Sequence, residues 1–124
     1  MSAGIIVFAH GSSVASANDA VRAVTAEMAR AGGWDLVETA FLEQAPPDLP
    51  AAAETLIARG ARRIVVVPYF LTLGIHLQRD LPRIADAIRS IHPGVVIRVT
   101  PPLDGHPAMA RVLADRAREG MIAP

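Results

Sequence analysis

Residues 5–12 read IIVFAHGS, a continuous apolar run that leads directly into a histidine, a glycine and a serine. Five β-prone apolar residues in succession indicate a strand that is covered on both faces. His10, Gly11 and Ser12 follow as a short polar loop. A buried strand that ends in a polar loop is typical of the parallel sheet of an α/β protein.

The rest of the chain alternates between further apolar runs and helical patterns. The additional strands are expected at residues 36–42, 63–70 and 95–99. Apolar residues recur every three or four positions between these runs, which predicts amphipathic helices. The helices are expected at residues 18–31, 48–60 and 107–119, with a further one between the second and the last of these, whose apolar stripe runs from Leu77 to Ile91. Asp48 and Asp80 are the predicted N-caps of the second and third helices, each followed two residues later by a proline.

This order of elements predicts a three-layer α/β/α fold with a four-stranded parallel sheet. Parallel strands require crossover connections, and such crossovers are right-handed. We expect the flavodoxin-like strand order 2-1-3-4, and we interpret residues 1–124 as a single domain because the chain is too short for a second core.

The composition excludes several classes of function. The chain has no cysteine, which excludes a thiolate nucleophile, a cysteine-ligated zinc site and an iron–sulfur cluster. All twelve basic residues are arginines, so neither a P-loop lysine nor a Schiff-base lysine is available. A formal net charge of zero and an aromatic content of 4% argue against binding to nucleic acid.

Membrane and export signals are not expected either. Residues 1–4 lack the positive start of a secretory signal. The longest apolar stretch, residues 64–75, is shorter than the roughly 20 residues that a spanning helix requires. We therefore expect a soluble cytoplasmic protein that does not contact a membrane.

Candidate functional residues follow three of the predicted strands. In an open parallel sheet, ligands bind beyond the carboxyl ends of the strands, at the point where the chain leaves in opposite directions. For the order 2-1-3-4, that point lies between the first and third strands. His10 follows the first strand, His76 follows the third, and Glu43 follows the second. The topology thus predicts that two imidazoles and a carboxylate meet at one edge.

Each of these residues also has a purely structural interpretation. His10 and His76 can be structural residues bonded to the backbone, and Glu43 can be a solvated loop carboxylate. His92 lies at a predicted helix end, where a histidine interacts favourably with the helix dipole. His106 lies in a turn after the last strand and can either line the crevice or serve the turn.

Other functions fit parts of the same loop. Ser12 and Ser13 precede a helix N-terminus, as in a phosphate or flavin mononucleotide site, but the chain offers few aromatic residues to hold a flavin. A histidine phosphatase would need an arginine before the histidine, where this chain has Ala9. A serine hydrolase would need a Gly-x-Ser-x-Gly motif, which the sequence lacks.

Three segments together resemble the small sirohydrochlorin chelatases of the CbiX and SirB type. They are AHGS at residues 9–12, AFLE at residues 40–43, and PYFLTLGIH at residues 68–76, which runs into DLP at residues 80–82. The resemblance covers about residues 5–100. It implies a chelatase-like fold, insertion of Co²⁺, Fe²⁺ or Ni²⁺ into sirohydrochlorin for cobalamin or sirohaem, and a homodimer equivalent to a two-lobed chelatase. It assigns His10 and His76 to the metal and Glu43 to the acidic position.

The chemistry of these residue types fits the implied reaction. Neutral imidazole suits Co²⁺, Fe²⁺ and Ni²⁺, whereas thiolates would hold a soft ion too firmly for release. An imidazole, with an ordinary pKa of about 6.5, can also accept pyrrole protons near neutral pH. The carboxylate arms of the substrate need donors, for which Ser12, Ser13 and Arg79 are candidates. No organic cofactor is expected; a tetrapyrrole or metal carrier without catalysis is the alternative, followed by a flavin or phosphate binder.

Overall fold

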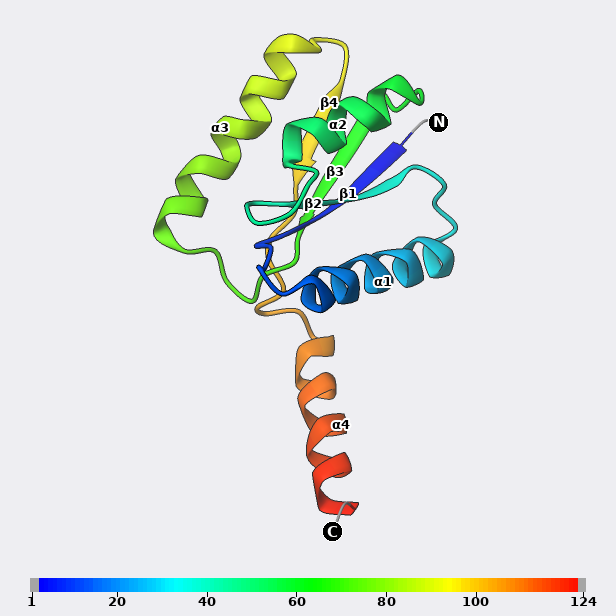
Figure 1. The fold of residues 1–124 in the computed structure, drawn as a ribbon, viewed down its shortest axis with the longest axis vertical. Coiled ribbons are helices and arrows are strands. Elements are labelled where there is room, and N and C mark those ends of the chain that lie inside the picture. The colour runs from blue at the N-terminus through cyan, green and yellow to red at the C-terminus, as the bar shows by residue number, and fades with distance from the viewer. Residues whose placement is uncertain (1–2, 123–124) are drawn as a thin grey trace.

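A computed structural model describes residues 3–122, in which strands and helices alternate along the chain (Figure 1). Residues 1 and 2, on which part of the expectation about export rests, lie outside the described residues. The elements are β1 (Ala3–Ala9), α1 (Ala15–Gly32), β2 (Val37–Phe41), α2 (Leu49–Ala58), β3 (Arg63–Pro68), α3 (Ile75–Ile91), β4 (Val96–Val99) and α4 (Ala108–Ile122).

The four strands form one parallel sheet in the order β2-β1-β3-β4, which confirms the predicted fold class. Strand β1 lies at the centre, with Ile6 opposite Glu38 of β2 on one side and opposite Val66 of β3 on the other. All four carboxyl ends therefore meet at one edge of the sheet. The loops after β1, β2 and β3 leave from that edge, as the sequence predicted.

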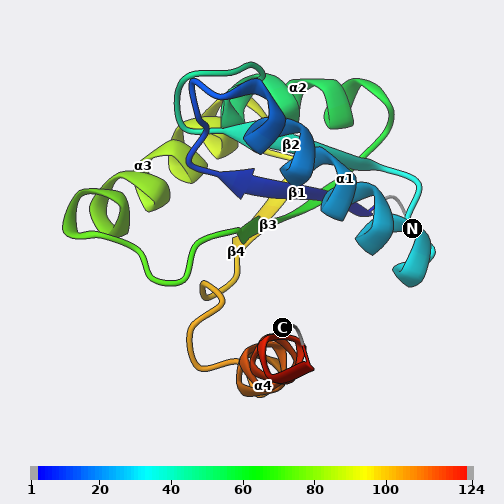
Figure 2. The same cartoon turned by 60° about the horizontal axis from the view of Figure 1, so that its bottom comes forward.

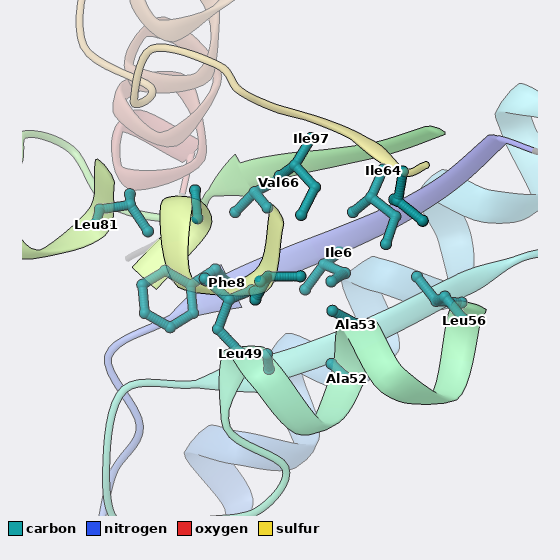
Figure 3. Close-up of a cluster of buried hydrophobic side chains, with 14 of the residues drawn as sticks. Ile6, Phe8, Leu49, Ala52, Ala53, Leu56, Ile64, Val66, Leu81 and Ile97 are labelled. Carbon is teal, nitrogen blue, oxygen red and sulfur yellow. The ribbon is translucent and has the colours of Figure 1, made fainter. Parts of the chain in front are cut away.

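The main core lies between one face of the sheet and helices α2 and α3 (Figure 3). Its larger members come from β1, β3, β4 and both helices, and each is at most 4% exposed. They are Ile6, Phe8, Leu49, Leu56, Ile64, Val66, Leu81, Ile88 and Ile97. Burial of apolar side chains is worth roughly 1.5–3 kcal/mol each, so this layer fixes the sheet and the loops that it carries.

The opposite face of the sheet is covered unevenly. Helix α1 lies over β1 and β2, on the other side of the sheet from α2 and α3 (Figures 1 and 2). Helix α4 projects away from the sheet, and none of its described residues is buried (Figure 2). The sequence predicted this helix but not its separation from the sheet. Among residues 3–122, no helix is long and apolar enough to cross a membrane.

Helix boundaries follow the expected signals in α2. Asp48 accepts a hydrogen bond from the Ala51 amide at 2.9 Å, and Gly60, with φ of 105°, ends the segment. The positive φ at Gly60 is a conformation that side chains rarely adopt. Helix α1 begins at Ala15, three residues before its predicted start, and ends at Gly32 with Gly33 as its cap residue, one residue beyond the predicted end.

The predicted start of α3 was wrong. The helix begins at Ile75, with Gly74 as its cap residue, so Pro82 lies inside the helix and Asp80 is not a cap. The first turn is closed by the Gln78 amide, which donates to the Gly74 carbonyl at 2.9 Å. Leu77 and Leu81 are both buried, and the earlier start lets this pair pack into the core. Burial of Leu77 thus outweighed the local signals of Asp80 and Pro82.

Candidate functional site

The first part of the site is the pair of side chains formed by His10 and Glu43. Hydrogen bonding between β1 and β2 continues past both strands: the Leu42 amide donates to the Ala9 carbonyl at 2.9 Å, and the Glu43 amide donates to the His10 carbonyl at 3.1 Å. These bonds bring His10 Nε2 to 3.9 Å from Glu43 Oε1. Both side chains are more than half exposed, so a ligand can reach the pair.

A single hydrogen bond determines which nitrogen of His10 is free. His10 Nδ1 lies 3.1 Å from the Gly11 carbonyl oxygen. A carbonyl only accepts hydrogen bonds, so in the neutral ring Nδ1 carries the proton and Nε2 keeps its lone pair. The free Nε2 is the atom that faces Glu43. This nitrogen can bind a metal ion or accept a proton, and the adjacent carboxylate stabilises the resulting positive charge.

The ring of His10 is also held by packing. It meets the ring of Phe70 edge to face, with 6.4 Å between centroids, and Phe70 in turn packs on Phe8 of the core at 5.9 Å. The loop after β3 therefore supports the histidine that follows β1. This contact places the Phe70 ring beside His10.

Gly11 permits the close approach of the two loops. Its φ is 89°, and a Cβ atom added there would lie 1.8 Å from the Glu43 carbonyl oxygen. A side chain at this position would separate the β1 and β2 loops, and with them His10 and Glu43. Gly11 is therefore needed for both its backbone conformation and its lack of a side chain.

Asn18 is a site residue that the sequence analysis missed. Its side chain is buried, at 6% exposure, and bonds reciprocally to the backbone of Ser12. The Ser12 amide donates to Asn18 Oδ1 at 2.9 Å, and Asn18 Nδ2 donates to the Ser12 carbonyl at 2.8 Å. The loop after His10 is thus fixed from helix α1. The sequence shows only an asparagine at the start of the predicted helix, and its bonds to Ser12 depend on how α1 packs.

Ser12 and Ser13 both lie in this loop, and they differ in their hydrogen bonds and in their exposure. The Ser12 hydroxyl oxygen accepts from the Val14 amide at 3.0 Å, and its own amide is bonded to Asn18. Ser13 is exposed. The bonds of Ser12 argue against the phosphate-cradle interpretation, because one of the backbone amides needed for such a cradle already has a partner.

His76 and Arg79 form a second cluster at the start of α3. Arg79 Nη2 lies 3.3 Å from His76 Nδ1, and since a guanidinium only donates, Nδ1 is the acceptor. Both residues are exposed, and Arg79 also contacts Asp80 at 3.4 Å. The interactions found among residues 3–122 join His10 to Glu43 and His76 to Arg79, but none joins the two histidines.

Residues 3–122 offer no complete metal site by themselves. Within the described part of the chain, no three His, Asp or Glu side chains lie close enough together to hold a metal ion. His10 and Glu43 thus provide at most part of a coordination shell. An ion in transit needs such an open arrangement, since a full shell would retain it.

The other two histidines have structural partners. His92, at the end of α3, bonds through Nε2 to Glu54 Oε1 of α2. His106 Nδ1 accepts from the Ala108 amide at 3.0 Å, which caps the start of α4. His92 thus joins two helices, in addition to its expected position at a helix end, and His106 serves the turn before α4.

An apolar cavity of about 440 Å³ lies beside the site. Its lining includes Phe70, whose ring also packs on His10. The lining residues are Tyr69, Phe70, Leu71, Leu103, Met109 and Val112. Three of them, Tyr69, Phe70 and Leu71, belong to the loop after β3.

Proteins of known description resemble this chain over most of its length. A family model described as CbiX matches residues 4–120. A chloroplastic sirohydrochlorin ferrochelatase of Arabidopsis thaliana is 33% identical over 114 residues, which are 91% of this chain and 50% of the plant protein. A sirohydrochlorin cobaltochelatase of Sulfurisphaera tokodaii is 32% identical over 116 residues, covering 94% of this chain and 92% of the archaeal one.

Solved structures share the fold. A CbiX protein of Marinobacter aquaeolei, described as a putative cobalamin biosynthesis protein, superposes with a TM-score of 0.84 at 28% identity, covering 96% of this chain and 97% of that one. SirB of Bacillus subtilis, solved with Fe³⁺, gives a TM-score of 0.84 at 26% identity, covering all of this chain but 49% of SirB.

The four proteins named above fall into two lengths. The chain spans about half the length of the Arabidopsis and Bacillus proteins, and nearly the whole length of the Sulfurisphaera and Marinobacter proteins. The family model matches almost all of the described residues in either case. With His10, Gly11 and Glu43 at the carboxyl edge of a 2-1-3-4 sheet, this chain belongs to the CbiX family.

Proposed function

We propose that this chain inserts a divalent metal ion, Co²⁺, Fe²⁺ or Ni²⁺, into sirohydrochlorin, a step toward cobalamin or sirohaem. Membership of the CbiX family supports this, as do relatives described as sirohydrochlorin cobaltochelatase and ferrochelatase. SirB has also been solved with Fe³⁺ and with cobalt. The metal ion is a substrate in this proposal, and the reaction uses no organic cofactor.

The observation that carries the proposal is the free Nε2 of His10 beside the carboxylate of Glu43. Insertion replaces two pyrrole N–H protons by one divalent ion, so the site must deliver a cation and remove two protons. The His10 nitrogen can coordinate the ion or accept a proton, and Glu43 balances the positive charge in either state. This nitrogen can hold the ion or take up one proton at a time, and both protons pass on to the solvent to which the pair is open.

His76 and Arg79 complete the proposed machinery. Arg79 donates to His76 Nδ1, which keeps that nitrogen occupied in the absence of substrate. A carboxylate arm of the macrocycle is a stronger partner for a guanidinium than a neutral imidazole is. Substrate binding would therefore draw Arg79 away and release His76 Nδ1 as a second metal ligand or proton acceptor. Ser13, exposed in the loop after β1, and the Ser12 hydroxyl are proposed donors to other carboxylate arms.

We also propose that the working unit is a homodimer. The chain spans about half of SirB and of the Arabidopsis protein. His10 and Glu43 are exposed at one edge of a small sheet, which leaves a wide macrocycle largely unenclosed. A second copy facing this edge would enclose the substrate and add its own imidazoles.

Turnover tests the proposal directly. Purified protein is incubated with excess sirohydrochlorin and Co²⁺, Fe²⁺ or Ni²⁺, and the loss of the free-base absorption spectrum is followed. We expect catalytic acceleration with at least one ion, continuing over many turnovers. A rate equal to the protein-free reaction would refute the enzyme assignment. A change that stops at one equivalent of substrate would identify a tetrapyrrole or metal carrier, and a yellow protein as purified would identify a flavin binder.

A further inference from the structure

Asp80 carries a carboxylate that serves neither the start of α3 nor the core. Helix α3 begins at Ile75, so Asp80 lies in its second turn and does not cap it. The side chain is about half exposed, and Oδ1 accepts from Arg79 Nε at 3.4 Å. That is its one hydrogen bond among residues 3–122. An exposed ion pair of this kind adds little to stability, so the carboxylate is available to a ligand.

His76 lies on the same face of α3 as Asp80. The two residues are four positions apart, and side chains at this spacing are neighbours on a helix surface. Two metal ligands four residues apart on one helix are a recurring way to present them to a single ion, as in the His-Glu-x-x-His helix of zinc proteases. Helix α3 therefore presents an imidazole and a carboxylate side by side.

A single guanidinium group contacts both side chains. Arg79 Nη2 donates to His76 Nδ1 at 3.3 Å, and Arg79 Nε donates to Asp80 Oδ1 at 3.4 Å. The N–H groups of Nε and Nη2 point from the same edge of the planar guanidinium group. The two acceptors thus face one cation from the same side. A metal ion that binds both of them has to displace Arg79.

The two acceptors suit the ions of the proposed reaction. An imidazole nitrogen and a carboxylate oxygen are ordinary ligands for Co²⁺, Fe²⁺ and Ni²⁺. Within residues 3–122 there is no third His, Asp or Glu side chain close enough to form a cluster with them. An ion held by two protein ligands keeps most of its coordination positions open, so it can pass on to another set of nitrogens.

We propose that Asp80 and His76 together bind the incoming divalent ion, and that Arg79 occupies this pair until it is displaced. Because the guanidinium group bridges both side chains, its departure frees both ligands at once. This inference rests on the proposed function for the identity of the ion and for the carboxylate arm that draws Arg79 away. It adds a second protein ligand to His76, and it assigns to Asp80 the loading of the ion.

Binding of Co²⁺ without any tetrapyrrole gives the first test. The affinity is measured by calorimetry and by the visible absorption of the bound ion. We expect Asp80→Asn to weaken binding about tenfold or more, because a negatively charged ligand is lost. Asp86→Asn is the matched control: it removes the same charge from the same helix, where Asp86 pairs with Arg89. Equal affinities in the parent and in Asp80→Asn would overturn the proposal, as would an equal loss in the control.

Removal of Arg79 distinguishes a metal ligand from a residue that only orients the arginine. Arg79→Gln should raise the affinity for Co²⁺ roughly tenfold, because a positive charge beside the ion is lost. Asp80→Asn made in the Arg79→Gln background should still weaken binding. If Asp80 acted only through Arg79, it would have no effect there, and that result would overturn the proposal. So would the absence of Co²⁺ binding from both the parent and Arg79→Gln.

Steady-state kinetics separate the loading pair from the reaction. With sirohydrochlorin in excess, Asp80→Asn should raise KM for the metal ion and leave kcat near the parent value. A fall in kcat at unchanged KM for the ion would contradict a loading role. Turnover by the parent without a contribution of Asp80 to Co²⁺ binding would refute this inference and leave the chelatase proposal intact. Co²⁺ binding that depends on Asp80, in a chain without turnover, would do the reverse.

Discussion

The hydrogen bond from His10 Nδ1 to the Gly11 carbonyl determines which ring nitrogen can bind a metal ion or accept a proton. It leaves Nε2 free, 3.9 Å from Glu43, and Gly11 lets the two loops meet. Asn18 fixes the next residue of the loop by its two bonds to Ser12. The position of the reactive nitrogen therefore depends on backbone contacts that involve no other ionisable group.

Replacement of Asn18 tests this dependence at the residue scale. Asn18→Ala leaves the Ser12 amide and carbonyl without their partner, which costs about 1–3 kcal/mol of stability. We expect kcat for metal insertion to fall roughly tenfold or more, because the His10 loop loses its fixed position. Thr25→Val is the matched control, since Thr25 is buried in the same helix and bonds only to Val21 of that helix. An equal loss of kcat in the control would show that Asn18 acts through stability alone.

At the residue scale, the sequence predicted which residues form the site better than it predicted the contacts that these residues make. His10 and Glu43 meet as expected, because the carboxyl ends of adjacent parallel strands must lie together. The role of Asn18 could not be predicted, since its bond to Ser12 depends on how α1 packs. That His76 lies against Arg79 also depends on where α3 begins, which local signals placed incorrectly.

Helix α3 shows how packing overrides local signals at the scale of one element. Asp80 followed by Pro82 favours a start at residue 80, yet the helix begins at Ile75 and buries Leu77 as well as Leu81. Pro82 lacks an amide hydrogen and is exposed within the helix. Helix α3 therefore contains Pro82, which is unfavourable in a helix interior. The earlier start adds a turn that packs on the core and positions His76.

Pro82→Ala distinguishes the two helix starts. In a helix that begins at Ile75, alanine restores a backbone hydrogen bond and removes the clash of the proline ring, so the free energy of unfolding should rise by roughly 1–3 kcal/mol. If the helix began at residue 80, proline would occupy its favourable first turn, and alanine would be neutral or destabilising. Urea denaturation monitored by circular dichroism measures the difference. A decrease in stability would contradict the observed start.

For the whole molecule, the sequence predicted the sheet, and the family resemblance implied a homodimer without indicating how two copies would meet. The strand order follows from apolar runs joined by crossover helices, and it is observed as expected. The separation of α4 could not be predicted, because its amphipathic pattern shows only that one face needs burial and does not identify the surface that buries it. The same amphipathic pattern is expected of a helix that packs on the sheet of its own chain and of a helix that packs on another molecule.

The role of His10 is tested most directly by the metal-insertion rate of His10→Ala beside that of His92→Ala. His92 is the matched control, because it is a histidine that bonds to Glu54 at the end of α3 and has no part in the proposed chemistry. With Co²⁺ or Fe²⁺ and sirohydrochlorin, we expect the His10 variant to lose about 10²-fold or more in kcat while the His92 variant stays near the parent rate. A folded His10→Ala protein that inserts metal at the parent rate would contradict the central role of this nitrogen.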